Sequence, residues 1–92
     1  MTRKYEFVAI FQPTEEGVTN GKDAIASQFG DSQITITEEQ DMGEKVLAYE
    51  IADQDRGHYY LYEIEADPNA ITPISQSLKL KSEVLKFLFV KK

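Results

Sequence analysis

The chain has 92 residues, 41% of them apolar, which is enough for one hydrophobic core and fits a single domain over residues 1–92. It contains no cysteine, which excludes disulfides, zinc–thiolate sites and thiol nucleophiles. The longest apolar run, Phe7–Phe11, is far shorter than a membrane span. We therefore expect a soluble, cytoplasmic domain with no membrane partner.

Charge is distributed unevenly along the chain, although the net charge is −6. Residues 1–67 hold fifteen acidic and five basic side chains, a charge of −10. Residues 68–92 hold five basic and one acidic side chain, a charge of +4. This asymmetry indicates either a local basic surface for nucleic acid on an acidic body or a solvated charged tail.

The N-terminal part is predicted to form a strand and then a helix. Lys4–Phe11 is rich in β-branched and aromatic residues and has apolar side chains on both faces, as a central strand does. Thr14–Phe29 has apolar residues at helical spacing, with Gly30 and Asp31 as the expected end of the helix.

Two alternating segments follow, Gln33–Thr37 and Val46–Ile51. Their apolar residues change from even to odd positions, so an extra residue must lie between them. Gly43 could supply it as a bulge within one long strand, or Glu39–Gly43 could be the turn of a hairpin. The alternation alone leaves both alternatives open.

The next elements are a turn at Asp53–Gly57, a strand at His58–Ala66 and a short amphipathic helix. The helix is expected to begin with Asp67 as N-cap and a proline at the following position. Pro73 lies inside this segment, so the helix is either kinked there or begins again with Thr72 as its cap.

A last strand is predicted over Val84–Val90, which completes the order strand–helix–strand–strand–helix–strand. This order is that of the α+β ferredoxin-like βαββαβ fold, a four-stranded antiparallel sheet with both helices on one face. Parity then places five aliphatic side chains on the uncovered face, more than a monomer usually exposes: Val8, Ile10, Leu61, Leu88 and Val90.

The sequence provides little for catalysis. His58 is the only imidazole, and the acidic clusters fall in predicted turns and edges rather than at metal-ligand spacing. The segment after the first strand, Phe11–Thr14, has neither the glycines nor the arginine of a phosphate-binding acylphosphatase loop. We expect no enzymatic activity, no metal, no cofactor and no small-molecule substrate.

Several segments, in order along the chain, resemble bacterial small-subunit ribosomal protein six: Lys4–Glu6, Gly43–Ile51, Gly57–Tyr60, Leu78–Leu80 and Val84–Leu88. The resemblance implies a bent second strand rather than a hairpin at Gly43. It also implies a structural role in the cytoplasmic ribosome, bound to the central domain of small-subunit ribosomal RNA as a heterodimer with small-subunit protein eighteen. The sequence departs from the family pattern in several places: Glu44 replaces a base, Glu50 replaces a proline, and Ala52 and Asp53 stand where lysines are usual. The charged extension after the last strand is reduced to Lys91 and Lys92.

Two sets of site residues follow. Because the last strand runs antiparallel to the first, cations from both ends of the chain should meet at one corner and bind RNA phosphates there. Lys86 should lie further along the open face, and Lys79 and Lys81 could extend this basic surface. The predicted RNA-binding residues are Arg3, Lys4, Tyr5, Lys86, Lys91 and Lys92. The predicted partner-binding residues are Val8, Ile10, Tyr59, Leu61, Leu88 and Val90, with an acidic rim of Glu6, Glu63 and Glu65. The alternative function is a protein-interaction module or homodimer that uses the same open face.

Overall fold

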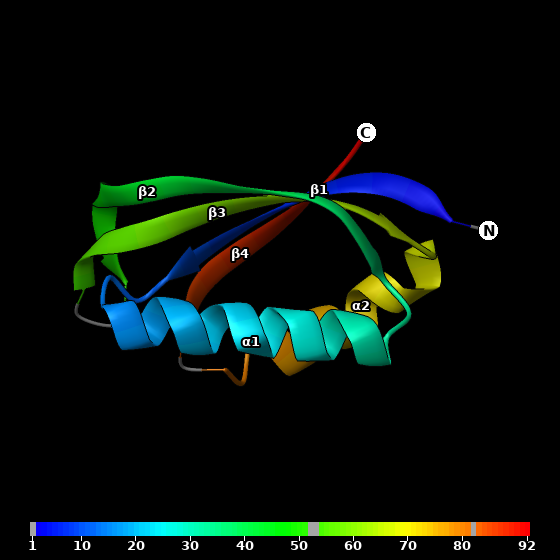
Figure 1. Cartoon of the computed structure of the whole chain (residues 1–92), viewed down its shortest axis with the longest axis horizontal. Helices are drawn as coiled ribbons and strands as arrows, with labels where there is room; N and C mark the ends of the chain where they lie inside the picture. The colour runs from blue at the N-terminus through cyan, green and yellow to red at the C-terminus, as the bar shows by residue number, and fades with distance from the viewer. Residues whose placement is uncertain (1, 52–53, 82) are drawn as a thin grey trace.

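The computed structural model describes residues 2–51, 54–81 and 83–92. A four-stranded antiparallel sheet, in the order β2-β3-β1-β4, lies over two helices that cover one of its faces (Figure 1). The elements are β1 Arg3–Phe11, α1 Glu15–Asp31, β2 Thr35–Ile51, β3 Gln54–Ala66, α2 Pro68–Leu78 and β4 Val84–Lys91. The predicted ferredoxin-like fold is confirmed.

Aromatic side chains fill the core between the sheet and the helices. Phe7 is fully buried, with its ring centroid 4.7 Å from that of Phe89 and 5.0 Å from that of Phe29. Odd positions of β1 face the helices because successive strand residues alternate between faces. The even positions of β1 therefore point to the uncovered face, as the sequence predicts.

The second strand is one continuous element with a bulge, which confirms the bulge alternative and excludes a hairpin at Glu39–Gly43. Gly43 has φ +83, a conformation that favours glycine, and the register of β2 against β3 shifts between Asp41 and Gly43. The Asp41 carboxylate accepts a hydrogen bond from the Gly43 N–H at 2.8 Å, which holds the bulge. The same carboxylate lies 2.6 Å from the imidazole of His58, so the single histidine supports this bulge.

Two predicted boundaries differ from the structure. The predicted turn at Asp53–Gly57 is wrong over Gln54–Gly57, which are the first residues of β3; Asp53 lies outside the described residues. Gln54, Arg56 and Gly57 pair with the C-terminal part of β2. The length of this pairing depends on both strands, so the residue pattern of one strand does not predict it. Helix α1 ends at the predicted Gly30 and Asp31, but both residues are still helical, and Gln33 supplies the positive φ of 58° after them.

Helix α2 has the predicted start, because the Asp67 side chain accepts a hydrogen bond from the Asn69 N–H at 2.8 Å. It runs without interruption through Pro73, so a second start at Thr72 is excluded. Pro73 is exposed, which lets water replace the hydrogen bond that proline cannot donate. Burial of Ile74 and Leu78 against the core keeps the helix in place.

Candidate RNA and protein interfaces

The six predicted partner-binding residues share the sheet face that no helix covers. Val8 lies directly opposite both Leu61 and Leu88, on the strands to either side of β1. Ile10 lies opposite Tyr59 on β3. We call this group the apolar strip: Val8, Ile10, Tyr59, Leu61, Leu88 and Val90.

Exposure varies along the apolar strip. Leu88 is 57% exposed and Val90 42%, whereas Ile10 is only 8% exposed. Ile10 is sheltered because Gly57 lets it approach the β3 backbone; a Cβ on Gly57 would lie 2.3 Å from Ile10 Cγ2 and 3.3 Å from Leu47 Cδ2. The strip therefore has an exposed end on β4 and a packed end beneath Leu47. A small apolar hollow of about 210 Å³ lies between the two ends.

Three glutamates form a row across the same face, beside the apolar strip. Glu63 lies directly opposite Glu6 on β1 and opposite Glu38 on β2. The pKa of Glu38 is raised, because a hydrogen bond with Glu63 favours the protonated form of Glu38 over the charged form and because the two negative charges repel. We call Glu6, Glu38 and Glu63 the acidic row. Glu38 is not among the predicted rim residues, since a second register shift, between Ile36 and Glu38, sets its position.

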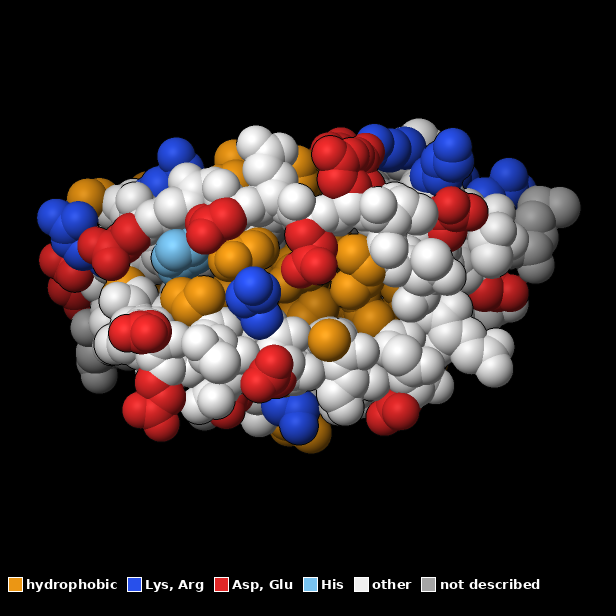
Figure 2. Space-filling view, viewed as in Figure 1, with side chains coloured by type: hydrophobic (Ala, Val, Ile, Leu, Met, Phe, Trp, Pro, Cys, Tyr) orange, Lys and Arg blue, Asp and Glu red, His pale blue; other side chains and the backbone are white. Residues whose placement is uncertain are grey.

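Four predicted RNA-binding cations meet at one corner, formed by the start of β1 and the end of β4. Tyr5 pairs with Lys91, and the backbone N–H of Lys92 donates to the carbonyl of Lys4 at 3.1 Å. In Figure 2, Lys and Arg side chains gather at the end of the molecule where Figure 1 places both termini, with acidic side chains beside them. We call Arg3, Lys4, Lys91 and Lys92 the basic corner.

The corner is split between the two faces of the sheet, and the remaining cations lie elsewhere. By alternation Lys4 and Lys92 belong to the open face, whereas Arg3 and Lys91 point to the helix side. Lys86 pairs with Ile10, six residues before Lys92 and so roughly 20 Å away along β4. Lys86 lines the apolar hollow of the open face with Ile10 and Leu88, and it also lines a second hollow with Lys79.

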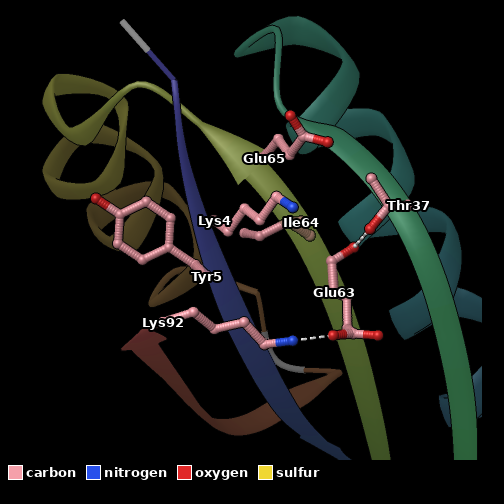
Figure 3. Close-up of a pocket in the computed structure, with 7 residues that line it drawn as sticks. All are labelled: Lys4, Tyr5, Thr37, Glu63, Ile64, Glu65 and Lys92. Atoms are coloured by element: carbon pink, nitrogen blue, oxygen red, sulfur yellow. Dashed lines mark hydrogen bonds and ion pairs between the residues drawn. The ribbon is translucent and has the colours of Figure 1, made fainter.

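Lys92 is bonded to an acidic side chain rather than free at the corner. Its ammonium forms an ion pair with Glu63, within a cleft of about 270 Å³ that Lys4 and Glu65 also line (Figure 3). This bond is the main cause of the lowered pKa of Glu63 and of the raised pKa of Lys92. Tyr5 lies at the edge of the cleft, with its ring turned toward the core and only 8% of the residue exposed.

The described ranges contain neither a metal centre nor a membrane span. No group of three or more His, Cys, Asp or Glu side chains within them could hold a metal ion. No helix among them is long and apolar enough to cross a membrane. The candidate site consists of two surfaces, one apolar with an acidic margin and one basic.

The strand order and the two helices on one face define the class of small α+β domains with a ferredoxin-like sheet. The sequence matches the family Ribosomal protein S6 over residues 4–91, and the chain belongs to that family. It is 36% identical over 89 residues to the small ribosomal subunit protein bS6 of Treponema denticola, covering 97% of this chain and 96% of that protein. It is 31% identical over 91 residues to bS6 of Phytoplasma australiense, covering 97% and 98% of the two chains.

The fold agrees with a solved structure of the same family. The crystal structure of 30S ribosomal protein S6 from Thermotoga maritima superposes with a TM-score of 0.86 at 20% identity, covering 100% of this chain and 89% of that one. Family membership makes the chain a structural component of the small subunit of the cytoplasmic ribosome, in association with ribosomal RNA.

Proposed function

We propose that this chain binds the central domain of small-subunit (16S) ribosomal RNA together with small-subunit protein eighteen. In this proposal the basic corner contacts RNA phosphates, and the apolar strip with the acidic row contacts the protein. The chain acts by binding alone, without a catalytic step, a metal or a cofactor.

The observation that carries the protein contact is the exposed β4 end of the apolar strip. Leu88 and Val90, 57% and 42% exposed, adjoin the half-buried Val8 and Leu61 on a face that no helix covers. Contiguous apolar surface of this kind is typical of a protein contact. The acidic row beside it complements a basic protein, because opposite charges at an interface margin steer and orient the partner.

The basic corner supports the RNA contact. Arg3, Lys4 and Lys91 are exposed cations from two adjacent strand ends. On a chain of net charge −6 they form a local attraction for phosphate. Tyr5 is not included in the proposed contact surface, because its ring packs in the core.

Charge reversal tests the RNA contact. Arg3→Glu and Lys91→Glu should each weaken assembly onto central-domain RNA and reduce the slope of log K against log salt by about 0.7–0.9 for each phosphate that is no longer neutralised. Lys45→Glu is the matched control, because Lys45 is exposed on β2 opposite Gly57, away from the corner. Equal effects of all three reversals would show that only net charge matters.

The mass of the chain in solution separates this proposal from the alternative of a homodimer through the open face. Sedimentation at micromolar concentration should give a monomer alone and a heterodimer after addition of the basic protein. A tight homodimer that the basic protein does not dissociate would favour the alternative.

A further inference from the structure

The ion pair between Lys92 and Glu63 connects the two surfaces of the proposed function. Lys92 belongs to the basic corner and Glu63 to the acidic row, yet the two side chains are bonded to each other (Figure 3). They are 39% and 32% exposed, so the pair is open to solvent and to ligands. One cation of the corner is thus already neutralised within the chain.

We propose that Glu63 and an RNA phosphate compete for Lys92, which makes this ion pair an autoinhibitory contact at the RNA surface. The inference rests on the proposed function. A phosphate that approaches Lys92 also meets the negative charge of Glu63, so the two anions compete for one positive charge and the phosphate binds more weakly while the ion pair persists. The neighbouring Glu6 and Glu38 add to the field that holds Lys92 in place.

The position of the pair indicates what would release Lys92. Leu61 precedes Glu63 by two residues on the same face of β3, and Val90 precedes Lys92 by two residues on β4. Two residues span about 7 Å, so a partner that covers the apolar strip ends beside the ion pair. A basic side chain of that partner next to Glu63 replaces the Lys92 ammonium as its counterion. Lys92 is then free for phosphate, and binding of the two ligands is positively coupled through this pair.

The test compares the affinities of the unmodified chain and of its variants for a central-domain RNA fragment, each measured without the protein partner. The salt concentration is about 50 mM, where weak phosphate contacts are measurable. Glu63→Gln should raise the affinity about 1.5- to 5-fold, the factor that corresponds to an exposed ion pair. Glu50→Gln is the matched control, because it removes the same charge from an exposed position near the end of β2, beside the pair Ile51 and Gln54 and away from the basic corner. The gain should disappear in a Lys92→Gln background, and it should fall to about 1-fold when the protein partner is saturating.

Three outcomes would overturn the inference. Equal gains from Glu63→Gln and Glu50→Gln would mean that RNA affinity depends only on the net charge of the chain. A gain that persists in the Lys92→Gln background would show that Glu63 does not act through Lys92. Failure of every variant to bind RNA, with and without the partner, would overturn the proposed function as well, which distinguishes it from the first two outcomes.

Discussion

The substitution Leu88→Asp separates the role of the open face in binding from its role in folding. Leu88 is 57% exposed, so folding buries a little under half of its side chain. Full burial of a leucine contributes about 1.5–3 kcal/mol, so the fold should lose roughly 1 kcal/mol, and a further fraction of that for the poor strand propensity of Asp. With a total loss of about 1–1.5 kcal/mol, the variant should remain folded, with a midpoint of thermal unfolding lower by roughly 4–12 °C.

Binding should respond much more strongly than folding. A partner that covers Leu88 would meet a carboxylate in place of an apolar side chain and would have to desolvate it, which costs at least about 2 kcal/mol, or roughly 30-fold in affinity. Leu80→Asp is the control, because Leu80 is 85% exposed and follows α2, away from the open face. Titration calorimetry with the basic protein, alongside urea unfolding of each variant, gives both quantities. Heterodimer formation that Leu88→Asp leaves unchanged, or that Leu80→Asp weakens equally, would refute the assignment of this face.

Two further predictions concern the packing and the charges that hold the sheet. Gly21→Ala should destabilise the fold by about 1–2 kcal/mol in urea unfolding, because its Cβ would lie 2.4 Å from the buried Phe11 ring. Gly30→Ala is the control and should be neutral or stabilising, because a Cβ there would have nothing within 4 Å. A Gly21→Ala variant as stable as the unmodified chain would contradict this close approach. Glu38→Gln should raise the free energy of unfolding at pH 7 and low salt, because the folded-state pKa of Glu38 is raised beside Glu63 and its negative charge is therefore unfavourable in the folded chain. This gain in stability should vanish as the pH falls through that pKa, or as salt screens the charges of the acidic row. A gain that is independent of pH and salt would exclude this electrostatic cause.

The alternation of the strands is what makes the faces of the sheet predictable. Val8 and Leu88 are expected on the open face because strand side chains alternate with a period of two, and the structure has them there as direct neighbours. The meeting of Lys4 with Lys92 follows from the antiparallel order of the first and last strands alone. Topology and parity therefore determine which residues share a surface.

Register and packing across strands could not be predicted from the sequence. Glu38 joins the acidic row only because β2 shifts by one residue against β3 between Ile36 and Glu38, and the polar residues that follow this shift give no apolar alternation from which it could be located. Ile10 is on the predicted face but is nearly buried, because Gly57 and Leu47 approach it from β3 and β2. The bond between Lys92 and Glu63 depends on the same cross-strand geometry. Such pairings are properties of the assembled sheet.

The central claim, that the chain binds ribosomal RNA together with a basic protein partner, is tested most directly by one binding measurement. A central-domain RNA fragment is titrated with the chain alone, with small-subunit protein eighteen alone and with both proteins at equal concentration, at two salt concentrations. We predict a salt-sensitive complex that is much tighter when both proteins are present than with either alone. An RNA complex whose affinity does not change when this chain is added would contradict the claim.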